Sequence, residues 1–160
     1  MNALQRAGPL VAPKFPPNAV VVDHRRPLRD VLAENRIEIY NGDAADASIF
    51  PPRPQGIMHV VPGLEPFPES MSVEQAIACL EPEEGKSFAD LWTLVHCAHL
   101  LGGKDQKLYA FGSKARLHGV WFFPYIGLNN ARRYLSLTRS DFAVDFGTNA
   151  LMIEQVLVRE

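Results

Sequence analysis

Residues 107–126 read KLYAFGSKARLHGVWFFPYI, and this stretch decides the fold that the sequence predicts. Two runs rich in aromatic and β-branched residues, LYAF and VWFF, flank an eight-residue connection, GSKARLHG. Such residues favour the pleated surface of a sheet, and the glycines at both ends of the connection allow the backbone to turn. The pattern therefore predicts a β-hairpin whose connection carries Lys114, Arg116 and His118.

The segment before this hairpin predicts two helices. Ser72 is a helix cap followed by an apolar stripe that ends at Pro82. From Ser87 to Leu101 the sequence SFADLWTLVHCAHLL is apolar nearly all round, which is typical of a helix in the centre of a core. Ser87 and Asp90 have the spacing of a capping box with a shortened acid. A third, short helix is predicted over 27–34.

Several further runs have the composition of strands. The second half of the chain reads as a helix followed by antiparallel strands, without the strand–helix alternation that marks a parallel sheet. We therefore predict an α+β fold, with an antiparallel sheet from the C-terminal half packed on one or two central helices. In chain order the other strand candidates are NAVVV (18–22), RIEIY (36–40), IMHVV (57–61, ended by Pro62-Gly63), ARRYLSL (131–137) and the terminal run 150–159.

Proline divides the chain into two unequal parts. It accounts for 13 of 160 residues, and only Pro124 lies beyond Pro82. The early prolines exclude a helix and favour extended backbone, so residues 1–24 are predicted to form an extended N-terminal arm, and 25–160 a single α+β domain. The arm carries Leu10, Val11 and Phe15, which we interpret as contacts that dock on a partner. A disordered leader is the alternative.

The N-terminus has no continuous apolar core of a signal peptide, and no run approaches the roughly 18 apolar residues of a membrane span. We therefore expect a cytoplasmic protein without a membrane partner. The two cysteines, Cys79 and Cys97, both fall in apolar helical patterns, and we predict that they are buried free thiols rather than a disulfide.

Charge is segregated along the chain although the formal net charge is only −2. Residues 65–90 hold seven acids against one lysine, and residues 91–139 hold seven basic residues against one acid. The basic region includes Arg132 and Arg133 beyond the hairpin, together with Tyr109, Trp121, Tyr125 and Tyr134. Cations that meet phosphates and aromatic rings that stack on bases suit single-stranded nucleic acid. The same surface also suits an acidic protein, a second copy of the chain included.

Motifs for catalysis or metal binding are incomplete. His96, Cys97 and His99 lack a second pair of ligands at a recognisable spacing, and a core histidine explains His99 better. Asp141, Asp145 and Glu154 offer carboxylates for a divalent cation, but solvated strand faces explain them more simply. Ser113 is followed directly by Lys114, which would point the two side chains apart in an extended strand, and no serine-hydrolase elbow is present.

These observations predict a non-catalytic protein-interaction or assembly subunit that uses its N-terminal arm and its basic hairpin loop. We expect no cofactor and no bound metal. The predicted contacts for a protein partner or for nucleic acid are Lys114, Arg116, His118, Arg132 and Arg133. Two alternatives stay open, a nucleic-acid-binding protein that uses the basic and aromatic region 104–139, and a small metal-dependent hydrolase or nuclease.

Overall fold

A computed structural model describes residues 17–50, 56–101, 106–144 and 148–156. The predicted arm contacts Leu10, Val11 and Phe15 lie outside these residues. Within them the strands are β1 Val20–Asp23, β2 Ile37–Ile39, β3 Ile57–Pro66, β4 Met71–Ser72, β5 Lys86–Phe88, β6 Lys107–Tyr109, β7 Ala115–Leu117, β8 Val120–Asn129, β9 Arg132–Arg139, β10 Ala143–Val144 and β11 Asn149–Gln155. The helices are α1 Leu28–Glu34, α2 Val73–Cys79 and α3 Leu91–His96, with short 3₁₀ turns at Gly42–Ala45, Ala47–Ile49 and Ala98–Leu100.

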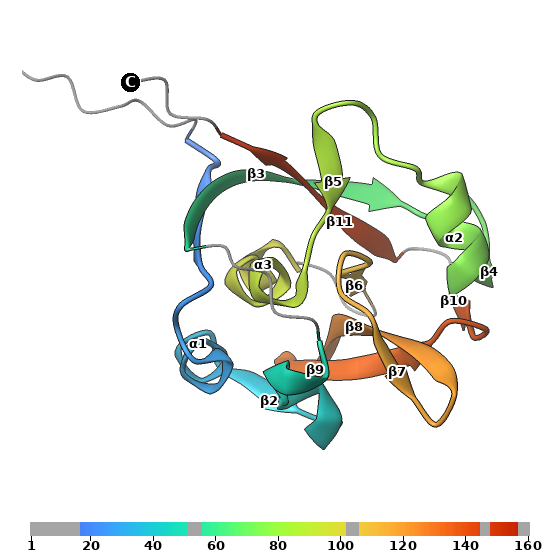
Figure 1. Ribbon diagram of the computed structural model, residues 1–160, viewed down its shortest axis with the longest axis horizontal. Coiled ribbons are helices and arrows are strands. Elements are labelled where there is room, and N and C mark those ends of the chain that lie inside the picture. The colour runs from blue at the N-terminus through green and yellow to red at the C-terminus, as the bar shows by residue number, and fades with distance from the viewer. Residues whose placement is uncertain (1–16, 51–55, 102–105, 145–147, 157–160) are drawn as a thin grey trace, which may run out of the picture.

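One large sheet dominates the described part of the chain. Its strand order is β1-β3-β11-β6-β8-β9-β2, with β5 paired to β11 and β7 to β8, and β4 and β10 form a separate two-stranded ladder. The sheet curves around α3, so that β3 and β11 pass on one side of this helix and β9 and β2 on the other (Figure 1). The α+β class and the largely antiparallel pairing are confirmed.

The sheet differs from the prediction in two respects. Strands β1, β2 and β3 come from the proline-rich first half, so the sheet is not confined to the C-terminal half. Two pairings are parallel, β11 with β6 and β2 with β9. The route of the chain explains the second of these, because α1 carries it from the β1 edge to the opposite edge, where β2 enters alongside β9 (Figure 1).

Strand β3 continues through Pro62-Gly63, which the sequence predicted would end it. The ladder with β1 stops at Val60, whereas the ladder with β11 continues to Pro66. Among the described strands, β3 has only β11 as a neighbour from Pro62 onward, so the other side of β3 makes no ladder hydrogen bonds with them. Proline is tolerated at such an edge, because no ladder hydrogen bond is lost there.

The central helix is much shorter than the predicted 87–101. Ser87 belongs to β5, where its backbone pairs with Ile153 of β11. The cap is Asp90, whose Oδ1 accepts a hydrogen bond from the Thr93 N–H at 2.9 Å. The helix ends at Cys97, and a 3₁₀ turn follows. The residues predicted as the first turn of the helix therefore pair in the sheet instead. Asp90, the acid of the predicted capping box, is itself the N-cap of α3.

Asp90 is also bonded to the first half of the chain. Its Oδ2 lies 2.8 Å from His24 Nε2, and both side chains are almost completely buried. An ionised carboxylate can only accept, so the His24 Nε2–H is the donor. Burial on its own would raise the pKa of Asp90, but the hydrogen bonds from His24 and Thr93 outweigh it and hold this pKa below its usual value.

The hairpin residues pair differently from the prediction. Strand β6 pairs with residues 125–127, and the VWFF run pairs instead with β7, which lies inside the predicted connection. A two-residue turn joins β7 to β8, with positive φ at His118 (51°) and Gly119 (79°). Turns with two left-handed residues match the twist of a β-hairpin. The second half of the basic connection therefore consists of strand β7 and this turn.

Two hydrophobic clusters lie on opposite faces of β6 and β8. The inner cluster contains Leu108 and Ile126 and includes the buried side chains of α3. The outer cluster contains Tyr109, Phe111 and Phe123 and includes Val73 and Ala76 of α2. The alternation of side chains along a strand produces this division. Within the described ranges, no helix has the length and apolar character needed to cross a membrane.

Gly112 permits a close backbone contact next to this hairpin. A Cβ atom there would lie 2.5 Å from the Phe88 carbonyl oxygen and 2.6 Å from that of Ala89. Gly112→Ala should therefore lower the free energy of unfolding by about 2 kcal/mol, because backbone atoms cannot move aside cheaply. Gly63→Ala is the matched control, since its added methyl meets nothing within 4 Å. Urea unfolding of both variants tests this, and equal stabilities would contradict it.

The Asp90 interactions make a second stability prediction. Asp90→Ala should cost about 2–3 kcal/mol, because α3 loses its cap and the buried His24 Nε2–H loses its acceptor. Because folding lowers the pKa of Asp90, its contribution is complete above the unfolded pKa of about 4 and is lost as pH falls through the lower folded value.

Urea unfolding at pH 7 and pH 3 measures both effects. The gap between wild type and Asp90→Ala should narrow at pH 3. Asp30→Ala, at an exposed acid in the first turn of α1, is the control and should stay within about 0.5 kcal/mol of wild type at pH 7. A gap that is the same at both pH values would show that the charge of Asp90 has no role in stability.

Candidate binding surface

An exposed tryptophan on β8 has two cations close to its ring. Arg116 of β7 is the direct cross-strand neighbour of Trp121. The Arg116 guanidinium carbon lies 5.8 Å from the centroid of the Trp121 ring, and the Lys114 ammonium lies 4.5 Å from it. Both distances allow cation–π attraction, which tryptophan supports best among the aromatic residues. We call Lys114, Arg116 and Trp121 the Trp121 cluster.

The charges of this cluster are not neutralised by carboxylates of the described residues. No ion pair there involves Lys114 or Arg116, although six other pairs form. Nearby Arg139 differs, because its guanidinium makes two hydrogen bonds to Asp141, and these lower the pKa of that acid. The Trp121 ring is 38% exposed. The cluster therefore presents an accessible aromatic ring with two positive charges.

The backbone that carries the cluster is anchored to the core. The Ser113 hydroxyl accepts a hydrogen bond from the Leu91 N–H at 2.9 Å, at the start of α3. The Gly112 N–H donates to the Ala89 carbonyl at 2.8 Å. Ser113 and Ala115 are buried on either side of exposed Lys114. This Ser113 has a structural role, and the fixed backbone reduces the entropy that a partner would have to overcome on binding.

The five predicted contacts do not form one site. Lys114 and Arg116 come together at Trp121, and exposed His118 lies in the turn between their two strands. Arg132 and Arg133 lie at the other end of β8, beside the turn that follows Asn129. Eight residues separate Trp121 from Asn129, which at the rise of a strand is about 26 Å. Spacing in sequence could not show this separation, because the register was unknown.

The two distant arginines line a groove of about 470 Å³. The groove also contains a third arginine, Arg36, which the sequence reading did not select. Arg36 follows α1 and has a positive φ of 54°. The parallel pairing of β2 with β9 brings Arg36 close to the other two arginines. The remaining lining residues are Glu38, Leu101, Leu128 and Ala131.

A row of tyrosines crosses the outer face of the sheet. Ring centroids are 5.2 Å apart between Tyr109 and Tyr125, 6.0 Å between Tyr125 and Tyr134, and 4.3 Å between Tyr134 and Tyr40. Burial is the largest of the effects that raise the pKa of Tyr134 to about 12. Tyr40 completes the row from the first half of the chain, and sequence reasoning missed it because only the β2–β9 pairing reveals its position.

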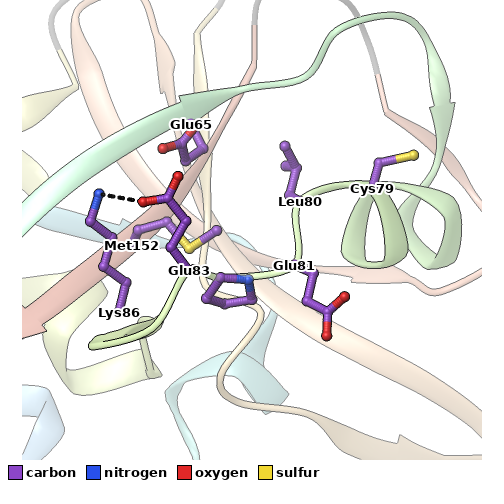
Figure 2. Close-up of a pocket in the computed structure, with 8 residues that line it drawn as sticks. Glu65, Cys79, Leu80, Glu81, Glu83, Lys86 and Met152 are labelled. Carbon is purple, nitrogen blue, oxygen red and sulfur yellow. Dashed lines mark ion pairs between the residues drawn. The ribbon is translucent and has the colours of Figure 1, made fainter.

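Acidic residues gather on another part of the molecule, around a small cavity of about 150 Å³ beyond α2. Glu65, Glu81 and Glu83 line it, and Lys86 forms a 3.8 Å ion pair with Glu83 (Figure 2). Cys79 also lines the cavity, and in Figure 2 its sulfur points away from this ion pair. Within the described ranges, no group of three or more His, Cys, Asp and Glu is arranged to hold a metal ion, and Asp145 lies outside those ranges.

The two thiols have different surroundings, which corrects the prediction that both are buried. Cys97 is buried in the core, and burial, followed by the charge of Asp90, raises its pKa to about 12. Cys79 is exposed, and it is the last residue of α2, beyond the buried Val73 and Ala76 of the same helix. Both cysteines are free.

Comparison with known proteins gives no relative for this chain. No protein-family model matches it. No curated protein matches it. No solved structure matches it. The function is therefore inferred from the surfaces described above.

The difference between the thiols predicts a two-phase reaction with a thiol reagent. Under native conditions one thiol, Cys79, should be modified rapidly, while Cys97 should react at least 100-fold more slowly, because it is buried and protonated. Mass spectrometry after iodoacetamide treatment measures this. Cys79→Ser should remove the rapid phase, and urea should make Cys97 reactive. Rapid modification of both thiols in the native protein would contradict the buried position of Cys97.

Proposed function

We propose that this protein is a non-catalytic interaction subunit that binds an acidic partner protein through the Trp121 cluster. The observation that carries the proposal is the exposed Trp121 ring with Lys114 and Arg116 over it and with no carboxylate partner for either cation among the described residues. Tryptophan and arginine are the residues most often found at the energetic centre of protein interfaces. The part of the predicted N-terminal arm that precedes β1 is proposed as a second contact on the sequence evidence alone.

Charge supports the choice of an acidic protein. Lys114 and Arg116 have no carboxylate partner among the described residues, and two cations side by side attract the carboxylates of a partner. This attraction steers an acidic partner to the cluster and accelerates association. The aromatic ring supplies apolar area at the same point. A partner that places carboxylates near Arg116 and an apolar side chain on Trp121 would satisfy both features of the surface.

Substitutions in the cluster test this proposal. Trp121→Ala should weaken the complex by about 2 kcal/mol, roughly 30-fold in Kd, and Arg116→Glu should have an effect of similar size with a slower association rate. The measurement is quantitative mass spectrometry of proteins that co-purify with the chain from its native cells, followed by biolayer interferometry with the purified partner. Arg29→Glu, at another exposed arginine, is the matched control and should bind like wild type.

Two results would overturn the proposal. One is a partner whose affinity is the same for wild type, Trp121→Ala and Arg116→Glu. The other is a partner whose affinity falls by the same factor for Arg29→Glu as for Trp121→Ala and Arg116→Glu. This would show general electrostatic attraction rather than a site. Circular dichroism of each variant establishes that the fold is retained.

Single-stranded nucleic acid is the second candidate partner, and the tyrosine row favours it. The Lys107 ammonium lies 5.3 Å from the Tyr125 ring centroid, so a second aromatic ring on the same sheet has a cation close to it. Fluorescence anisotropy with a 12-nucleotide single strand separates the two candidates. Nucleic-acid binding should weaken steeply with salt and be reduced by Trp121→Ala, whereas an acidic-protein site should leave the oligonucleotide unbound at 150 mM salt.

A further inference from the structure

We infer that the arginine groove between β2 and the β8–β9 turn is a separate binding site for a small dianionic molecule with an apolar body, a phosphate monoester being the chemistry that fits it. The proposal does not depend on the Trp121 cluster, which lies about 26 Å away along β8. Its basis is the charge, shape and lining of the groove formed by Arg36, Arg132 and Arg133.

The charge of the groove suits a dianion. Three guanidinium groups and one carboxylate, Glu38, line it, which leaves a net charge of +2. Arg132 is already paired with Glu38, at 3.2 Å between Nη1 and Oε1. Within the described residues neither Arg36 nor Arg133 has a carboxylate partner. Two of the guanidinium groups that line the groove therefore have no compensating carboxylate among the described residues.

One of these two arginines is held in place. The Arg133 Nη1 donates a hydrogen bond to the Asn35 carbonyl oxygen at 3.3 Å, and the side chain is half-buried. This bond uses one N–H of five and restrains the guanidinium group at one nitrogen, so the other donors remain for a ligand. A planar fork of donors binds the oxygens of phosphate or carboxylate two at a time, which a lysine cannot do.

The remaining wall of the groove is apolar. Leu101, Leu128 and Ala131 line it together with the arginines. A volume of about 470 Å³ falls within the range of small-molecule sites, which combine an apolar wall with a few convergent polar groups. Inorganic phosphate alone would leave this wall uncovered. The lining therefore suits an anion that carries an aromatic or aliphatic group.

Phenyl phosphate is the probe that tests the site, with the full chain observed by ¹H–¹⁵N NMR. Saturable shifts are expected at Arg36, Leu128, Ala131 and Arg133, and not at Trp121. Phenol lacks the charge and inorganic phosphate lacks the apolar body, so each should bind at least 10-fold more weakly. Arg36→Gln and Arg133→Gln should each weaken phenyl phosphate at least 5-fold, and Arg29→Gln should leave it unchanged.

Glu38→Gln provides a test with the opposite sign. It removes the negative charge of the groove and releases Arg132, so phenyl phosphate should bind several-fold more tightly. If Arg133→Gln fails to fold, the affinity of Arg36→Gln for phenyl phosphate tests the inference. This variant should fold, because Arg36 is exposed and has no side-chain hydrogen bond among the described residues.

Three results would overturn the inference. The first is the lack of saturable shifts up to 10 mM phenyl phosphate. The second is a set of shifts that spreads over arginines outside the groove and survives Arg36→Gln. The third is equal affinity for phenol and phenyl phosphate. None of these results depends on the Trp121 cluster. A negative result with phenyl phosphate therefore does not affect the proposed function, and a negative result with the Trp121 variants does not affect the inference about the groove.

Discussion

The carboxylate of Asp90 holds together the two halves of this chain. One oxygen caps α3 through the Thr93 N–H, and the other accepts from His24, which directly follows β1. The side chains of Asp90 and His24 are almost completely buried, so water cannot replace either of them as a hydrogen-bond partner. Leaving a buried donor without its acceptor costs more than the net gain of an average hydrogen bond. The position of α3 relative to the β1 edge of the sheet therefore depends on this one acid.

The position of α3 in turn determines where binding groups can lie. The residues on either side of Asp90 receive the β6–β7 connection, Ala89 through its carbonyl and Leu91 through its N–H. These bonds explain why a glycine occupies position 112 and why the following serine is buried. Lys114 then emerges from a fixed backbone over the Trp121 ring. Ala89, Leu91 and Ser113 are buried, so the core fixes the backbone from which the exposed Lys114 side chain reaches the Trp121 ring.

Sequence patterns predicted those features that depend on local alternation and capping. The α1 and α2 helices, the Ser72 cap and the strand character of β9 and β11 followed from periodicity within a few residues. The failures share a different cause. Ser87 looked helical until its pairing with β11 was known, and Pro62 looked like a strand end until β1 was seen to stop before it. These outcomes depend on strands that lie far away in sequence, β1 for Pro62 and β11 for Ser87, and local patterns do not contain that information.

The same limit applied to the binding residues. The sequence prediction placed Lys114 and Arg116 together, as the structure does, but it also placed Arg132 and Arg133 with them. It did not include Arg36 or Tyr40. All of these errors concern register. At physiological ionic strength exposed charges are screened over about 8 Å, roughly a third of the distance along β8 between the two basic sites. The two sites therefore do not share an electrostatic field. The basic segment that residue type indicated as one surface therefore forms two separate ones, the Trp121 cluster and the arginine groove. The groove is lined by Leu101 and Leu128, which pack with the inner cluster, whereas the tyrosine row lies on the outer face.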